Sequence, residues 1–153
     1  MLSVGSRAPE FTLADQDERE VSLTSLLNAG PLILYFFYPA DFTPICTRQA
    51  CLVRDLHEDI RRTGLTVAGI SPQSPATHRE FRARYGLTFP LLSDPDKAVI
   101  RMYDVNGFLG FGVRRVTYLI DQGRIIRDAV VADLRLREHE AFIRTALAVG
   151  DGR

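Results

Sequence analysis

The chain has 153 residues, of which 46% are hydrophobic and 25% are charged. This length and composition are typical of one folded domain with a substantial core, so we expect a single domain over residues 1–153. Lys plus Arg and Asp plus Glu are both 19, which gives a formal net charge of zero. Proteins that bind nucleic acid or an acidic membrane normally carry a basic excess, and the sequence carries none, so neither partner is expected.

The sequence also bears on the compartment in which the chain works. The longest strongly apolar run, residues 32–38, is well short of the roughly 20 residues that cross a bilayer. The N-terminus lacks a basic segment followed by an apolar one, so we expect no secretory signal and a cytoplasmic location. In that reducing compartment two cysteines, here Cys46 and Cys51, are more often catalytic, metal-binding or inert than a permanent disulfide.

The first half of the chain predicts a hairpin, a buried strand and a long helix. Residues 11–13 and 20–23 are short alternating segments separated by a polar turn, which is typical of a β-hairpin. Residues 32–38 are continuously apolar and aromatic, which favours a central strand covered on both faces. Residues 43–62 have a helical composition, and Gly64 is placed to end that helix.

The second half predicts further strands and helices: a strand over residues 65–70, helices from Ser74-Pro75 to about Tyr85 and from Asp94-Pro95 to about Tyr103, a hairpin of 116–120 and 125–131, and an amphipathic helix over 138–149. The alternation of strand and helix implies a parallel central pair with right-handed crossovers, to which the late hairpin adds antiparallel strands. The sequence therefore predicts an α/β thioredoxin-like fold, with a mixed central sheet, flanking helices and an N-terminal β-hairpin.

Cys46 lies where the predicted buried strand gives way to the next helix, the position at which open α/β sheets present their ligand sites. Thr43 and Pro44 have the residue types of an N-cap and a first helical residue, which would put Cys46 in the first turn. Backbone N–H groups there have no intrahelical acceptor, and the helix dipole is positive, so a thiolate is favoured over a thiol. A small buried hydrophobic residue is the competing interpretation, and position alone does not separate the two.

The spacing of Cys51 from Cys46 limits which thiol chemistry the two cysteines can perform together. In a regular helix, residues five apart have Cα atoms roughly 8–9 Å from each other. A disulfide needs less than about 7 Å, so a Cys46–Cys51 bond would require that part of the helix to unwind. Such a bond would be a poor structural link, because it closes a short loop, but unwinding suits a catalytic cycle. No Cys-x-x-Cys is present, and two cysteines with scattered histidines do not make a zinc site, so no metal or cofactor is expected.

The segment around Cys46 resembles the peroxiredoxins. Pro39, Thr43 and Cys46 match the signature Pro-x-x-x-Thr-x-x-Cys. With Cys51, and with the later Arg115-Val116-Thr117-Tyr118-Leu119-Ile120-Asp121, the chain is similar to the peroxiredoxin Q branch, also called bacterioferritin comigratory protein. Members of that branch often place a resolving cysteine five residues after the peroxidatic one.

The resemblance implies a thioredoxin-dependent peroxidase that reduces hydrogen peroxide and organic hydroperoxides and works as a monomer. Cys46 would be the peroxidatic nucleophile, and Cys51 would resolve its sulfenic acid to an intramolecular disulfide. Thr43 would hydrogen-bond the peroxide, and Pro39 would shield the sulfur from water. Arg115 would supply a fixed positive charge that stabilises the thiolate and the reacting oxygens.

Two details of the resemblance concern neighbouring residues. Arg114 has the same chemistry as Arg115, but successive strand residues point to opposite faces, and the family pattern selects Arg115. Ile45 stands where close relatives usually have Gly, which should stiffen the turn before Cys46. The glycine- and phenylalanine-rich residues 106–112 match no family pattern and are expected to form a simple loop.

Two other functions stay open on the sequence alone. A thiol–disulfide oxidoreductase on the same fold would act without peroxide, although the missing Cys-x-x-Cys disfavours it. A redox sensor or partner-binding domain would pass oxidation from Cys46 to another protein. An insulin-reduction assay without peroxide tests the first, and trapping a mixed disulfide with a partner other than thioredoxin tests the second.

Overall fold

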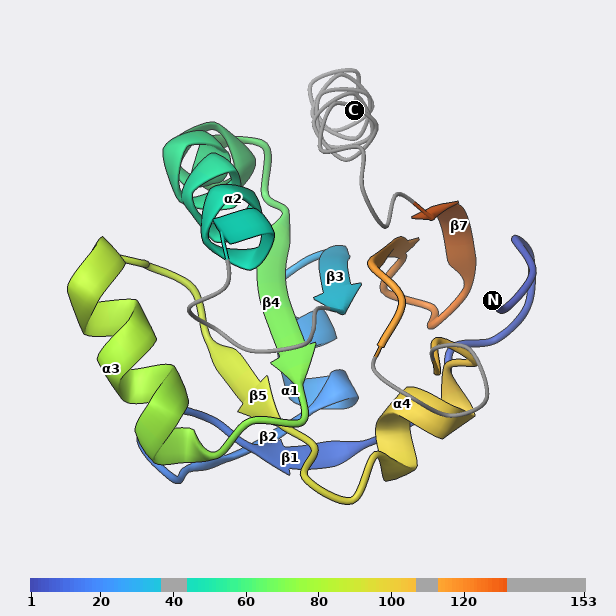
Figure 1. Cartoon of the computed structure of the whole chain (residues 1–153). Coiled ribbons are helices and arrows are strands. Elements are labelled where there is room, and N and C mark those ends of the chain that lie inside the picture. The colour runs from blue at the N-terminus through green and yellow to red at the C-terminus, as the bar shows by residue number, and fades with distance from the viewer. Residues whose placement is uncertain (37–43, 107–112, 132–153) are drawn as a thin grey trace.

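The computed structural model of the chain describes residues 1–36, 44–106 and 113–131, and it gives only the backbone of residues 44–50, 52 and 131 (Figure 1). The predicted C-terminal helix over residues 138–149 and most of the 106–112 loop lie outside these residues. Within them, no helix is long and apolar enough to cross a membrane.

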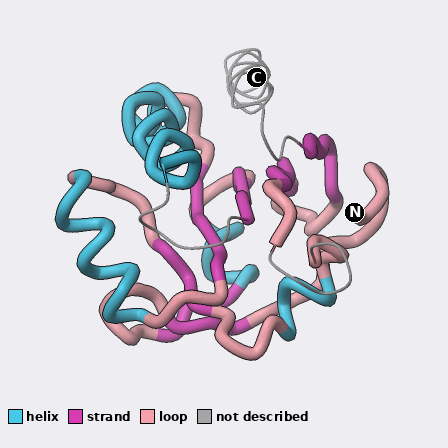
Figure 2. The backbone as a smooth tube through the Cα atoms, in the orientation of Figure 1, coloured by secondary structure: helices cyan, strands magenta, loops and turns pink. Residues whose placement is uncertain are grey.

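Seven strands form one mixed sheet in the order β2-β1-β5-β4-β3-β6-β7 (Figures 1 and 2). Their bounds are β1 (Thr12–Ala14), β2 (Glu20–Ser22), β3 (Leu32–Phe36), β4 (Thr66–Ser71), β5 (Leu91–Ser93), β6 (Val116–Ile120) and β7 (Ile126–Val131). The β3, β4 and β5 strands run parallel, whereas β1–β2, β1–β5, β3–β6 and β6–β7 are antiparallel pairs. The mixed sheet and both hairpins predicted from the sequence are confirmed.

Helices cover both faces of this sheet. They are α1 (Leu23–Asn28), α2 (Pro44–Arg62), α3 (Pro75–Tyr85) and α4 (Ala98–Met102). The α2 and α3 helices share an apolar cluster with one face, and α1 and α4 share a second cluster with the other. Neither α1 nor β5 was predicted as an element, since both are too short to show a periodic pattern.

Strand β3 is central to this architecture because all five of its residues are buried. Ile33 and Tyr35 belong to the cluster on the α2–α3 face, while Leu32, Leu34 and Phe36 belong to the cluster on the α1–α4 face. Full burial of one such side chain contributes about 1.5–3 kcal/mol. The continuous apolar run in the sequence is therefore explained by helices on both sides of the strand.

The α3 helix begins and ends where the sequence predicts. Ser74 is its N-cap, and the Ser74 hydroxyl accepts a hydrogen bond of 3.2 Å from the Thr77 backbone N–H. Pro75 is the first helical residue, where a missing N–H costs nothing. Gly86 ends the helix in the left-handed region at φ 62°, which glycine adopts without steric strain.

The α4 helix begins later than predicted, at Ala98 rather than at Asp94-Pro95. Residues 94–97 instead form a turn, and Lys97 has φ 60°, which interrupts any helix from Pro95. The buried Asp94 carboxylate accepts a 2.8 Å hydrogen bond from the Ile100 backbone N–H. Asp94 therefore binds an N–H of the first helical turn from outside the helix.

A buried histidine joins α3 to the sheet. His78 is fully buried, and its Nε2 and Nδ1 atoms lie 2.7 Å and 3.2 Å from the hydroxyl oxygens of Ser71 and Ser93. These two serines are register partners in β4 and β5. Burial lowers the pKa of His78 from its ordinary 6.5 to about 4, so the ring is neutral at neutral pH.

We predict that His78 makes the protein less stable in acid. Between about pH 6.5 and pH 4 the unfolded chain binds a proton at His78 and the folded chain does not, so the free energy of unfolding falls as the pH is lowered. The loss across this window is on the order of 3 kcal/mol. Urea unfolding of wild type and His78→Gln at several pH values measures it.

The difference between the two proteins isolates the histidine from other titrating groups, such as the buried Asp94, whose pKa burial raises. His78→Gln should be less stable at pH 7, and its stability should fall less steeply toward pH 4.5. Equal slopes for the two proteins would contradict the prediction.

Candidate active site

The N-terminus of α2 carries the predicted nucleophile. Strand β3 ends at Phe36, and the next described element begins at Pro44, which is the first residue of α2, as expected. Cys46 is therefore the third residue of the helix, among backbone N–H groups that have no intrahelical acceptor. These groups and the helix dipole favour a negative charge at this position. The predicted Thr43 and Pro39 lie outside the described residues.

Both cysteines lie in one continuous helix. The α2 helix has 19 residues and contains Cys46 and Cys51, and Cys51 is a half-buried free thiol. Helical geometry separates the two Cα atoms by roughly 8–9 Å, beyond the reach of a disulfide. The helical conformation is therefore one in which the thiols are separate, and a bond between them needs the first turns of α2 to open.

The part of α2 beyond Cys51 is fixed to the sheet by apolar side chains. Val53, Leu56 and Ile60 are at most 6% exposed and pack on the α2–α3 face of the sheet. Position 46 lies seven residues, close to two helical turns, before Val53, so the backbone there is on the same side of the helix.

Two polar side chains of α2 reach the last residue of α3 and the segment that follows it. The Arg54 Nη1 atom donates a 2.7 Å hydrogen bond to the Tyr85 carbonyl. The His57 Nδ1 atom contacts the hydroxyl of Thr88. These contacts, like the apolar ones, hold the part of α2 that follows Cys51.

Aromatic rings pack between the sheet and α2. The Tyr35 and Phe89 rings meet edge to face at 6.0 Å, and His57 meets Phe89 in the same way at 5.8 Å. The Tyr35 ring lies directly over Gly69, where an added Cβ would come within 2.7 Å of the ring. Glycine at position 69 is therefore required for Tyr35 to lie flat against the neighbouring strand.

Arg115 is buried, with 5% of its surface exposed, and immediately precedes β6. In the antiparallel β3–β6 pair Thr117 lies opposite Tyr35. Because the strands are antiparallel, earlier residues of β6 lie toward the Phe36 end of β3, and Arg115, which precedes β6, lies at that end. It is thus at the end of β3 from which the chain runs to α2.

The alternation of side chains along β6 separates the two neighbouring arginines. Leu119 packs on the α2–α3 cluster, whereas Val116 and Tyr118 pack on the opposite one. Continued alternation puts Arg115 on the α2 face and Arg114 on the other. Arg114 is exposed. Burial raises the pKa of Tyr118 to about 12, and the charge of Arg114 partly opposes this rise, as expected for a residue on that other side.

The described residues offer little for a metal ion. In residues 1–36, 44–106 and 113–131, no three His, Cys, Asp or Glu side chains come together as a possible metal site. Only the backbone of Cys46 is described, so its side chain is not among the groups compared. The arrangement of a helix N-terminus, a thiol and a buried arginine on one face suits chemistry at sulfur.

Comparison with known proteins gives the family. Residues 4–129 match the AhpC/TSA family. A peroxiredoxin homologue of Mycobacterium tuberculosis is 40% identical over 155 residues, covering 97% of this chain and 96% of that protein. The chain belongs to the AhpC/TSA family, in the peroxiredoxin Q branch. The chloroplastic peroxiredoxin Q of Oryza sativa is 45% identical over 128 residues, which are 82% of this chain and 58% of the rice protein.

Solved peroxiredoxin structures confirm the thioredoxin-like fold. Peroxidoxin BcpB from Mycobacterium tuberculosis superposes with a TM-score of 0.88 at 32% identity, covering 99% of this chain and 98% of that one. The bacterioferritin comigratory protein of Xanthomonas campestris, described for its alkyl peroxide reduction activity, gives 0.81 at 26% identity over 91% and 90% of the two chains. This peroxiredoxin therefore shares the architecture of its branch over nearly its whole length.

We predict that Arg54 limits how far α2 opens. Arg54→Gln removes the hydrogen bond to the Tyr85 carbonyl, and a bond of this kind from a one-third exposed side chain is worth about 1 kcal/mol. Amide hydrogen exchange over residues 54–62 should become about fivefold faster. Arg61→Gln, at an exposed position of the same helix, is the matched control and should leave exchange unchanged. Equal exchange in both variants would contradict the prediction.

Proposed function

We propose that this peroxiredoxin is a thiol peroxidase that reduces hydrogen peroxide and organic hydroperoxides with Cys46 as its nucleophile. The support is the position of Cys46 as third residue of α2, with the buried Arg115 on the same face of the sheet, in a chain of the AhpC/TSA family. A helix N-terminus and a fixed guanidinium both favour the thiolate, which is the species that attacks a peroxide.

In the first step the Cys46 thiolate attacks one oxygen of the hydroperoxide. An S–O bond forms and the O–O bond breaks, so the sulfur is oxidised to a sulfenic acid and the peroxide is reduced. The leaving alkoxide or hydroxide takes a proton and departs as an alcohol or water. Negative charge develops on the peroxide oxygens, and donors held in advance lower its energy. In our proposal Arg115 and Thr43 are those donors, and Pro39 keeps water from the sulfur.

In the second step the Cys51 thiol attacks the Cys46 sulfur. A disulfide forms and the sulfenic oxygen leaves as water, so no further oxidant is needed. The continuous α2 helix keeps the two cysteines too far apart for this bond, so its first two turns open, while the contacts of Val53 and Arg54 hold the rest. A thioredoxin-like dithiol then reduces the disulfide by thiol–disulfide exchange and is itself oxidised.

The same geometry bears on the oligomeric state and the compartment. Both cysteines belong to one helix of one chain, so the cycle needs no second subunit, and we propose a monomer. Regeneration requires a pool of reduced dithiol, which a reducing compartment such as the cytoplasm supplies.

Cysteine variants test the proposed cycle. Cys46→Ser should reduce thioredoxin-coupled peroxide consumption to background, because the nucleophile is lost. Cys51→Ser should undergo one oxidation per chain and then stall with thioredoxin. Oxidised wild type should have a mass lower by two hydrogens, with Cys46 and Cys51 joined within one chain. A Cys46→Ser protein that consumes peroxide at the wild-type rate would refute the proposal.

The two arginines provide a matched pair for a further prediction. Arg115→Gln should slow the reaction with hydrogen peroxide by about 100-fold, the usual loss for one donor to a developing oxyanion. Arg114→Gln removes the same charge on the other face and should stay within about twofold of wild type. The rate of sulfenic acid formation, followed by stopped-flow fluorescence or by competition with a reference peroxidase, measures both. Equal losses of rate in the two variants would mean that net charge, and not the position of Arg115, controls the reaction, which would contradict the prediction.

A further inference from the structure

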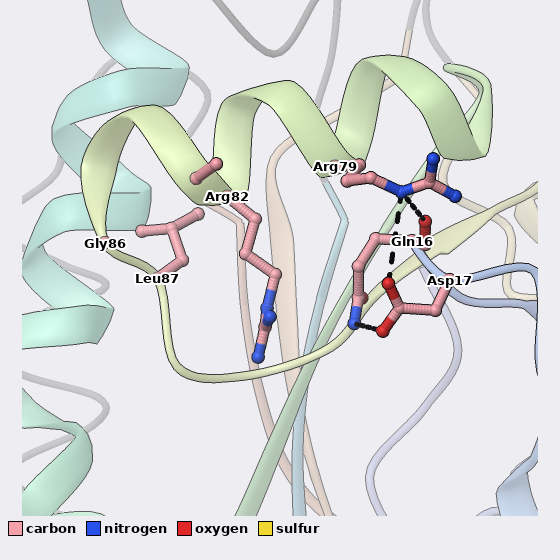
Figure 3. A pocket seen from close by; sticks show the side chains of 7 residues that line it. Gln16, Asp17, Arg79, Arg82, Gly86 and Leu87 are labelled. Carbon is pink, nitrogen blue, oxygen red and sulfur yellow. Dashed lines mark hydrogen bonds and ion pairs between the residues drawn. The ribbon is translucent and has the colours of Figure 1, made fainter.

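A second polar site lies away from the cysteine helix, in a hollow of about 320 Å³ between α3 and the turn that joins β1 to β2 (Figure 3). Arg79 and Arg82 of α3 and Gln16 and Asp17 of the turn provide its polar groups. None of the residues assigned to peroxide chemistry lines it. The hollow brings together segments more than 60 residues apart in the chain, which no local sequence motif reveals.

The two arginines are held in place by their Nε atoms. Arg79 Nε donates a 3.1 Å hydrogen bond to the Gln16 carbonyl, and Arg82 Nε donates a 3.2 Å hydrogen bond to the Phe89 carbonyl. A guanidinium fixed at Nε still has its terminal N–H groups to offer. In the part of the chain that the structure describes, the terminal nitrogens of Arg82 make no hydrogen bond.

Gln16 forms the rigid wall of the site. It is 5% exposed, and its Oε1 atom accepts a 3.1 Å hydrogen bond from the backbone N–H of Leu91, the first residue of β5. Its Nε2 atom donates a 3.2 Å hydrogen bond to the Asp17 carboxylate. An amide nitrogen has two hydrogens, so Gln16 is a further fixed donor.

The charges in the hollow do not balance. Two guanidinium groups one helical turn apart line the hollow with a single carboxylate, that of Asp17, which is about half exposed and 3.9 Å from Arg79 Nε. Like charges at this helical spacing repel each other. Burial is the main cause that lowers the pKa of the neighbouring His57, and the charges of Arg61 and Arg82 add to it. The hollow therefore has a net positive charge that an anion would offset.

We propose that this hollow binds a small oxyanion, with a phosphate group as the best match. Arginine forks match the geometry of phosphate and carboxylate oxygens, and charge-assisted hydrogen bonds are the strong ones. The volume is at the lower end of small-molecule sites, which suits phosphate or a small phosphomonoester. Asp17 competes with the anion for Arg79, so it limits the affinity.

Titration with inorganic phosphate, followed by NMR amide shifts at constant ionic strength maintained with chloride, tests this proposal. Wild type should show saturable shifts at residues 16–17 and 79–87. Arg82→Gln should bind about tenfold more weakly, because one charge-assisted donor is lost. Arg84→Gln is the matched control, since Arg84 lies on the same helix over the Tyr85 ring and does not line the hollow.

A variant that binds phosphate more tightly shows that changes in binding do not come from loss of folding. Asp17→Asn removes the competing carboxylate and should strengthen phosphate binding severalfold. Acetate in a parallel titration distinguishes a carboxylate ligand from a phosphate one, and saturable binding of either that Arg82→Gln weakens supports an oxyanion site. If the arginines only hold α3 to the turn, phosphate at constant ionic strength will cause no saturable shifts, or the same shifts in wild type, Arg82→Gln and Arg84→Gln, and either result would overturn the proposal.

Discussion

Strand β3 is hydrogen-bonded along both edges and covered on both faces, and the positions of the other elements follow from that burial. It pairs in parallel with β4 and antiparallel with β6, and its side chains alternate between the two apolar clusters. Its last residue leads toward α2, and the antiparallel register brings Arg115 to the same end of the sheet. A buried strand between two helical layers thus sets where a thiol and an arginine can meet.

In the proposed cycle the first turns of the α2 helix open while the rest of the helix stays folded. Beyond Cys51 it is held by apolar burial at Val53, Leu56 and Ile60 and by the hydrogen bond from Arg54 to α3. These contacts hold the part of α2 that stays folded in the proposed cycle, in which the helix first stabilises a thiolate and later lets a second thiol reach the same sulfur.

The α3 helix links the proposed active site to the rest of the molecule. Its Tyr85 carbonyl accepts the hydrogen bond from α2, His78 fixes it to β4 and β5, and Arg79 and Arg82 connect it to the turn after β1 and to the Phe89 carbonyl. An anion bound between Arg82 and Gln16 would therefore contact the element against which α2 is anchored. The two sites share a scaffold, although they share no lining residue.

The sequence by itself determined the features that depend on short-range physics. The continuous apolar run of β3, the Ser74-Pro75 start and Gly86 end of α3, and Pro44 at the head of α2 all follow from local preferences, and the active-site motif is itself local. Contacts between distant segments decided the rest. Asp94 accepts a hydrogen bond from the Ile100 N–H, and α4 begins only at Ala98. Arg115 is buried while its neighbour Arg114 is exposed. Gln16 and Arg82 line the same hollow although they are far apart in the sequence. A single sequence shows periodicity, but burial and proximity between segments far apart exist only once the sheet has formed.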